Sequence, residues 1–121
     1  MHVNLVTLSG RLVADPRQRE LPSGAPVANF SIAVNRPTRK KDGTFEDVLE
    51  GFFDCETFDG LAVAVATSLK KGSPVQLTGT LLQKTYQGND GNRVSKTEIR
   101  VRSIGPALVP TKSEPKEPQP A

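Results

Sequence analysis

Cysteine, histidine and tryptophan are almost or wholly missing from this sequence. Its 121 residues contain one cysteine, one histidine and no tryptophan. A disulfide needs two cysteines and zinc sites are built from several Cys or His ligands, so we expect no internal disulfide, no metal and no cofactor. His2 stands at the start of the chain, which leaves no basis for histidine-dependent acid–base or nucleophilic catalysis. Cys55 alternates with apolar positions and is predicted to be a small buried hydrophobe.

Long apolar runs are absent as well. No stretch approaches the roughly 18 apolar residues that cross a membrane. The first six residues lack the basic segment and apolar core of a secretory signal, so the sequence predicts a cytoplasmic protein. The net charge of +3 is mild and by itself only weakly indicates a nucleic-acid partner.

A change of composition divides the chain near residue 109. Residues 110–121 contain four prolines and no aromatic or branched apolar residue. Such a segment cannot bury enough apolar surface to offset its conformational entropy. We therefore expect one folded domain over residues 1–109 and a disordered, proline-rich tail over residues 110–121.

Alternation of apolar and polar residues predicts a mostly β domain. A leucine or valine every fourth residue after Phe58 predicts one short helix, with Asp59 as its N-cap and residues 70–72 as its C-terminal signal. Gly10 predicts a bulge or bend in the first strand. The predicted strands cover residues 3–13, 27–35, 48–58, 75–87 and 93–104, with a polar loop at 36–43. Three strands, a helix and two strands is the order of the OB-fold, a five-stranded Greek-key barrel.

The third predicted strand carries a candidate binding face. Phe52 and Phe58 point away from Phe53 and Cys55, so they face outward if the second pair fills the core. Exposed rings stack on bases of any identity, at about 1–3 kcal/mol per base. Tyr86, near the tip of the following hairpin, could add a third ring. The alternative is that the two phenylalanines pack under a loop or at a subunit contact, and that Tyr86 is an ordinary hairpin residue.

Basic residues bracket this aromatic face in the sequence. Four lie between residues 36 and 41, and Lys84, Arg93 and Lys96 lie on the later hairpin. Cations in these positions would follow phosphates and make binding depend on salt. The alternative for either loop is that its charges serve solubility.

Two carboxylates interrupt the candidate face. Asp54 and Glu56 stand between Phe52 and Phe58, and because carboxylates repel phosphates, a nucleic-acid backbone should not lie directly over them. They could accept hydrogen bonds from base edges or pair with a neighbouring arginine. With Asp59 they also suggest a magnesium site for phosphoryl chemistry. No glycine-rich phosphate loop or second ligand set accompanies them, so we do not expect an enzyme.

Four motifs in order resemble the bacterial single-stranded DNA-binding (SSB) family: residues 4–16 (NLVTLSGRLVADP), 27–36 (VANFSIAVNR), 52–58 (FFDCETF) and 69–75 (LKKGSPV). The similarity runs from about residue 3 to 108. It implies an OB-fold subunit of a homotetramer around which single-stranded DNA wraps, with stacking rings at Phe52, Phe58 and Tyr86. A fourth family aromatic falls near Thr38, which cannot stack. The full predicted DNA-binding set is Phe52, Phe58, Tyr86, Arg11, Arg36, Arg39, Lys40, Lys41, Lys84, Arg93 and Lys96.

The end of the chain departs from the family pattern. Family members usually end in an acidic peptide with an apolar tip that recruits replication and repair enzymes, whereas residues 117–121 have neither feature. The resemblance thus implies a short paralogue without that docking peptide, serving DNA replication, recombination, repair or a specialised process such as natural transformation. Two alternatives stay open: an OB-fold protein for RNA or replication restart, and an oligomeric adaptor that has lost nucleic-acid binding.

Overall fold

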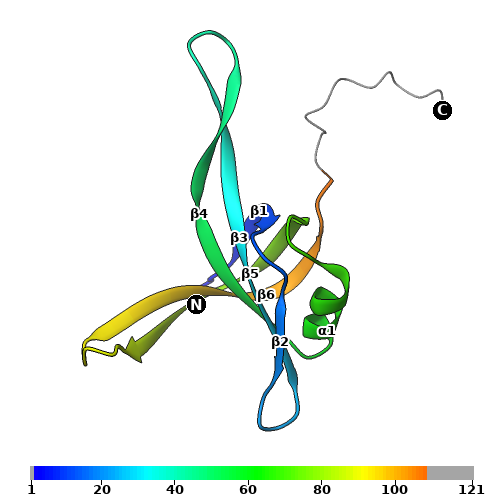
Figure 1. Ribbon diagram of the computed structural model, residues 1–121, viewed down its shortest axis with the longest axis vertical. Coiled ribbons are helices and arrows are strands. Elements are labelled where there is room, and N and C mark those ends of the chain that lie inside the picture. The colour runs from blue at the N-terminus through cyan, green and yellow to red at the C-terminus, as the bar shows by residue number, and fades with distance from the viewer. Residues whose placement is uncertain (1, 109–121) are drawn as a thin grey trace, which may run out of the picture.

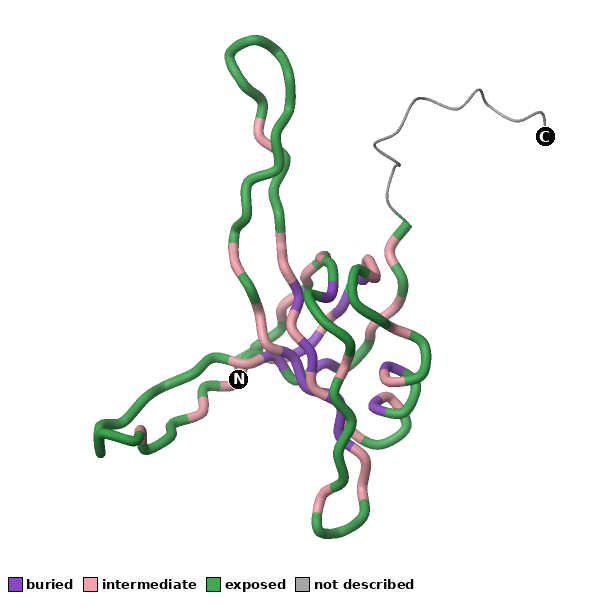
Figure 2. Tube along the Cα trace, in the orientation of Figure 1, coloured by how far each residue is buried: buried purple, intermediate pink, exposed green. Residues whose placement is uncertain are grey.

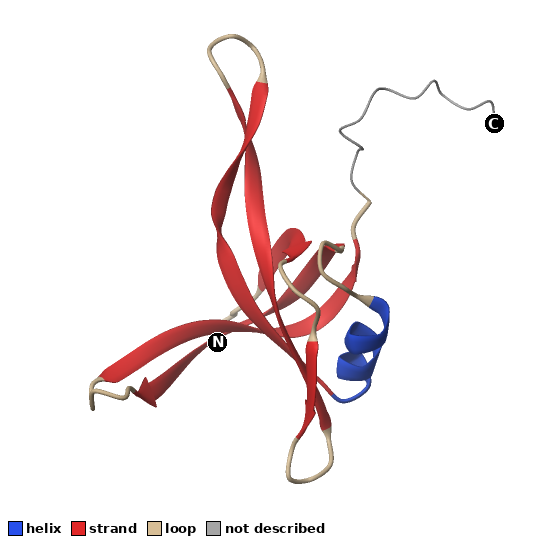
Figure 3. Ribbon diagram, in the orientation of Figure 1, coloured by secondary structure: helices blue, strands red, loops and turns tan. Residues whose placement is uncertain are grey.

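The computed structural model describes residues 2–108, so the tail predicted for residues 110–121 lies outside the described residues and the boundary at 109 stays a prediction. Figures 1 and 3 show the arrangement of six strands and one helix over this range. The elements are β1 (Val6–Leu12), β2 (Arg17–Glu20), β3 (Pro26–Arg39), β4 (Phe45–Phe58), α1 (Asp59–Ser68), β5 (Pro74–Gln87) and β6 (Arg93–Pro106).

Five of the strands close into a barrel. The strands are hydrogen-bonded in the order β1-β5-β6-β4-β3-β2, and β1 also pairs with β3 through Arg11↔Ala33 and Leu12↔Ile32. That second pairing joins the two ends of the five-strand set, while β2 is an additional partner on the outer side of β3. The helix lies between β4 and β5, the third and fourth barrel strands. The OB-fold expected from the sequence is therefore confirmed.

The core lies where the barrel strands and α1 meet, and it appears as the purple centre of Figure 2. It is built by residues of the five barrel strands together with Ala62 and Val65 of α1. Of the helix positions predicted by the four-residue spacing, Val65 is buried and Leu61 and Leu69 pack against the core. Cys55 belongs to it, with 2% of its surface exposed, as expected. No helix within residues 2–108 is long and apolar enough to cross a membrane.

Long two-stranded hairpins project from this core and are almost entirely exposed (Figures 1 and 2). One is formed by β3 and β4 at the top of the view, another by β5 and β6 at the lower left. The loop predicted at residues 36–43 was wrong for residues 36–39, because β3 continues to Arg39, which pairs with Phe45 of β4. The residues are polar because both faces of the hairpin meet solvent, not because strand pairing has ended. Residues 40–43 do form the turn.

The ends of other elements also differ from the prediction. Asp59 was expected to be the N-cap, but the cap is Phe58 and no side chain caps the helix. Asp59 is instead the first helical residue, with φ of 57°. The helix ends at Ser68, before the turn containing Gly72. The segment between the first two predicted strands contains β2, whose four exposed polar residues carry no alternation that periodicity could detect.

Gly10 allows the barrel to close. The register of β1 with β5 runs unbroken through Gly10, so the glycine does not mark a bulge. It lies instead where β3 crosses closely: a Cβ at this position would be 2.5 Å from the carbonyl oxygen of Ala33. Only a residue without a side chain fits there unless one strand moves.

We expect Gly10→Ala to lower the free energy of unfolding by about 1–3 kcal/mol, because the added methyl overpacks the β1–β3 crossing. Urea denaturation followed by circular dichroism measures this. Gly105→Ala is the matched control, since Gly105 is also in a strand and a Cβ there meets no atom within 4 Å. Equal stability of the two variants would contradict the packing explanation.

Candidate nucleic-acid interface

The outward face of β4 carries the side chains that the alternation predicted. Cys55 points into the core and Phe53 packs against it, while Phe52 points outward and is 64% exposed. In the strand register Glu56 lies opposite Arg100 of the parallel strand β6 and opposite Asn29 of the antiparallel strand β3, so these residues share the outward surface. We call this surface the outer sheet face: it is the outward side of β3, β4, β6 and β5 and carries Asn29, Phe52, Glu56, Lys84 and Arg100.

A buried carboxylate sits at the centre of the outer sheet face. Glu56 is only 2% exposed although it lies on the outward side of β4. The ammonium group of Lys84 on β5 donates to both of its carboxylate oxygens, at 3.2 and 3.1 Å. Arg100 adds a longer ion pair, with Nη2 3.6 Å from Oε1. Since an unpaired buried charge costs several kcal/mol, Lys84 and Arg100 are held here by the need to neutralise Glu56.

Lys84 connects this carboxylate to a second one. Its Nζ lies 2.9 Å from Oε2 of Glu98 on β6. The hydrogen bonds to Glu98 and, next, to Glu56 raise the pKa of Lys84, so the group stays protonated. The hydroxyl of Tyr86 donates to Oε1 of Glu98 at 3.4 Å, while 45% of Tyr86 is exposed. The hydroxyl of Tyr86 is thus held by Glu98, while much of the side chain stays open to solvent.

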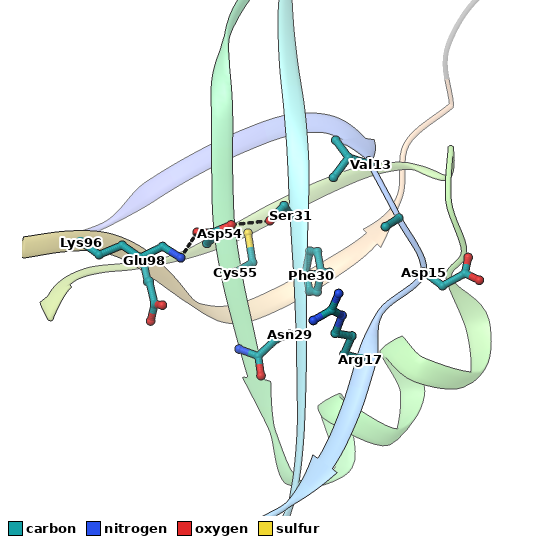
Figure 4. Close-up of a pocket in the computed structure, with 11 residues that line it drawn as sticks. Val13, Asp15, Arg17, Asn29, Phe30, Ser31, Asp54, Cys55, Lys96 and Glu98 are labelled. Carbon is teal, nitrogen blue, oxygen red and sulfur yellow. Dashed lines mark hydrogen bonds and ion pairs between the residues drawn. The ribbon is translucent and has the colours of Figure 1, made fainter. Parts of the chain in front are cut away.

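A separate ion pair lies nearby on β4 and β6. Lys96 Nζ is 2.6 Å from Oδ2 of Asp54, and the hydroxyl of Ser31 donates to Oδ1 of the same carboxylate (Figure 4). The hydrogen bond from Lys96, followed by that from Ser31, lowers the pKa of Asp54, and the same contact raises the pKa of Lys96. Both groups are therefore charged at neutral pH. Asp54 pairs with Lys96, whereas Glu56 pairs with both Lys84 and Arg100. An arginine partner had been expected, but the sequence did not identify which one.

Phe58, one of the three predicted stacking rings, does not present a bare surface. Phe58 is half-buried at the end of β4. The guanidinium carbon of Arg100 lies over its ring, 5.0 Å from the centroid. Phe52 and Tyr86 are the open rings of the predicted three, and Phe58 supports an arginine.

A pocket of about 370 Å³ opens on the outer sheet face beside the Asp54–Lys96 pair (Figure 4). Its walls come from the segment that joins β1 to β2 and from β2, β3, β4 and β6. Arg17, Asn29 and Ser31 contribute cationic, amide and hydroxyl groups to it. The pocket therefore offers both donors and acceptors to a polar, flat ligand edge.

The predicted cations are not brought to one place. Arg36 pairs with Glu50 at 3.5 Å and Lys40 with Glu46 at 3.2 Å, both along the β3–β4 hairpin. That hairpin leaves the barrel in a different direction from the β5–β6 hairpin, which carries Arg93 (Figure 1). Arg39, Lys41 and Arg93 are exposed.

Arg11 lies apart from these groups. It is opposite Pro74 at the start of β5, far along the strand from Lys84, and donates to the carbonyl oxygen of Gly72 at 3.1 Å. Its assignment to the DNA-binding set stays a prediction, as do the other assignments.

Sequence reasoning did not select several residues of the outer sheet face. Glu98 and Arg100 follow Lys96 at every second position of β6 and so share its face, and this spacing was the available signal. Asn29 and Arg19 are joined by a 3.3 Å hydrogen bond between β3 and β2. Nothing in the sequence indicated that contact, because β2 itself was not predicted.

Neither a metal site nor a reactive thiol emerges in the described part of the chain. Within residues 2–108, no three His, Cys, Asp or Glu side chains converge in a way that could hold a metal ion. Burial raises the pKa of Cys55 to about 12, so its thiol is neutral. The chemistry available on the outer sheet face is stacking, hydrogen bonding and ion pairing.

Comparison with known proteins agrees with this geometry. Residues 3–107 match the model of the single-strand binding protein family. Single-stranded DNA-binding protein 3 of Listeria innocua is 42% identical over 102 residues, covering 84% of this chain and 62% of its own. Single-stranded DNA-binding protein A of Bacillus subtilis is 40% identical over 102 residues, covering 84% and 58%. The chain thus spans about three fifths of the length of these relatives.

A solved structure supports the same assignment. The small single-stranded DNA-binding protein of Streptomyces coelicolor superposes with a TM-score of 0.76 at 25% identity, covering 89% of this chain and 97% of that one. The family match covers most of the chain, and two relatives exceed one third identity. The chain therefore belongs to the single-strand binding protein family.

Proposed function

We propose that this protein binds single-stranded DNA without regard to sequence and protects it, as a binding protein and not an enzyme. The observation that carries the proposal is the pair of open rings, Phe52 and Tyr86, on the outward side of an OB barrel in a member of this family. DNA replication, recombination and repair, or a specialised process such as natural transformation, would use such a protein. These processes would place it with the nucleoid in the cytoplasm.

Bases and phosphates would use different parts of the molecule. Bases stack on Phe52 and Tyr86, because an aromatic ring accepts any base. Lys84 and Lys96 are committed to carboxylates, so they contribute little net positive potential. Phosphates would instead lie along the exposed cations of the hairpins, among them Arg39, Lys41 and Arg93. When these cations neutralise phosphates, counterions leave the DNA, so binding weakens as the salt concentration rises.

We further propose that the protein assembles as a homotetramer. In support, Val6–Ser9 of β1 pair only with β5 in the described chain, which leaves a strand edge that a second copy could extend. Val3, Leu5 and Leu81 are exposed apolar residues near that edge. Sedimentation equilibrium should give four times the chain mass of 13.0 kDa, and a monomer would contradict the assembly.

The direct test is fluorescence anisotropy of labelled oligo(dT) at several salt concentrations, with a matched duplex and a matched RNA as competitors. We expect salt-weakened binding of the single strand and at least tenfold weaker binding of the duplex. Phe52→Leu should weaken binding about tenfold, since it keeps an apolar group but removes the ring. Val63→Ala, an exposed position on α1, is the control.

Each contrary outcome points to a different function. Preference for RNA over DNA would favour an RNA-binding role. No binding at low salt would favour an oligomeric adaptor that has lost nucleic-acid binding. Binding that Phe52→Leu leaves unchanged would instead exclude Phe52 as a stacking ring.

Lys84 should act on stability more than on DNA binding. Lys84→Met keeps the aliphatic stem but removes the donor to Glu56, so we expect the free energy of unfolding to fall by about 1–3 kcal/mol. Urea denaturation measures the loss. Lys41→Met, in an exposed turn, should leave stability unchanged. The reverse pattern, a stable Lys84→Met protein with a shallower salt dependence of DNA binding, would make Lys84 a phosphate contact.

A further inference from the structure

Arg100 covers the ring that the sequence had predicted to stack on DNA. Its guanidinium carbon is 5.0 Å from the centroid of Phe58, within the roughly 6 Å range of cation–π contacts. Phe58 is half-buried, so the rest of its surface packs against the protein. A base approaching this position from the Arg100 side meets the guanidinium group before it meets the ring.

The guanidinium group is held in place and still open to solvent. Its Nη2 lies 3.6 Å from Oε1 of Glu56, which is itself fixed by the two hydrogen bonds from Lys84. The side chain of Arg100 nevertheless remains 49% exposed. A planar group that is already held loses little further freedom when a ligand contacts it.

We propose that a DNA base stacks on Arg100, so that the Phe58 ring, the guanidinium group and the base form three successive layers. Bases stack on arginine planes as well as on aromatic rings. The inference rests on the proposed binding of single-stranded DNA and adds a contact on β6 to those on β4 and β5. In this arrangement Glu56 is a positioning residue, which acts on DNA only through Arg100.

A phosphate contact is the competing role for Arg100. The charge of the guanidinium group is already paired with the carboxylate of Glu56, which weakens its attraction for a phosphate, whereas stacking on a neutral base needs no unpaired charge. The guanidinium carbon also lies over the Phe58 ring, 5.0 Å from its centroid, so a base on the opposite side of Arg100 would continue a stack, which a phosphate would not. The two roles differ in what they predict for a strand that has no bases.

Arg100→Lys separates the two roles, because lysine keeps the charge and can still pair with Glu56 but has no planar group. The assay is anisotropy with labelled oligo(dT) and with an abasic oligomer of the same length. We expect about tenfold weaker binding of oligo(dT), unchanged binding of the abasic oligomer and an unchanged slope of log Kd against log salt concentration. Arg102→Lys, an exposed arginine on the same strand, is the matched control and should bind normally.

Arg100→Met is a second variant, which can still pack on Phe58 and should give the same base-dependent loss. Thermal melting of each variant checks that it is folded at the assay temperature. Folded variants with unchanged affinity for oligo(dT) would overturn the inference. Equal losses of affinity for oligo(dT) and for the abasic oligomer would also overturn it. So would a change of roughly 0.7 in the slope of log Kd against log salt concentration, which corresponds to the loss of about one phosphate contact.

The same experiment distinguishes this inference from the function on which it rests. If the wild-type protein does not bind oligo(dT), the proposed function itself fails. If the wild type binds, Phe52→Leu weakens binding and Arg100→Lys does not, only the stacking role of Arg100 fails.

Discussion

The outer sheet face is organised around one buried negative charge. Glu56 is 2% exposed in the middle of the sheet, where a carboxylate is tolerated only if cations surround it. Lys84 supplies two hydrogen bonds from β5 and Arg100 supplies an ion pair from β6. The remaining features follow from this requirement: Lys84 reaches Glu98, Glu98 accepts from Tyr86, and Arg100 lies over Phe58.

This network changes how a basic protein binds a polyanion. A positive net charge suggests that lysines near the binding surface attract phosphates directly. Here Lys84 and Lys96 are neutralised by carboxylates, and the surface they occupy presents flat groups and hydrogen-bonding groups instead. The hairpins, whose exposed cations extend beyond the barrel, are left to meet the phosphates (Figure 1). In the proposed complex the outer sheet face binds the bases, and the exposed cations of the hairpins contact the phosphates.

The sequence was sufficient for the fold because alternation is a property of each half-buried strand. Phe52 and Phe53 fall on opposite faces for this reason, and Val65 marks the buried side of α1. Alternation fails where both faces are solvated, which is why the outer end of the β3–β4 hairpin was taken as a loop and β2 was not predicted. The closing contact of Gly10 with Ala33 depends on two strands that are far apart in the chain, so only the structure could reveal it.

The candidate site was predictable only in part, for a related reason. Residue type and periodicity identified the outward rings, but partners across strands depend on register. The parallel pairing of β4 with β6 places Glu56 beside Arg100, and the antiparallel pairing of β5 with β6 places Lys84 near Glu98. Without that register, Lys84 and Lys96 looked like phosphate ligands and Arg100 was one of many surface cations.

The central claim is that bases of single-stranded DNA stack on the outer sheet face. Tyr86 tests it directly, because the chain has one tyrosine and no tryptophan, so its intrinsic emission comes from this residue alone. Tyrosine fluorescence should be measured during titration with oligo(dT), corrected for DNA absorbance, with the abasic oligomer as the reference. We predict strong, saturable quenching by oligo(dT) and little quenching by the abasic strand. Saturable binding of oligo(dT) that leaves Tyr86 emission unchanged would contradict the account.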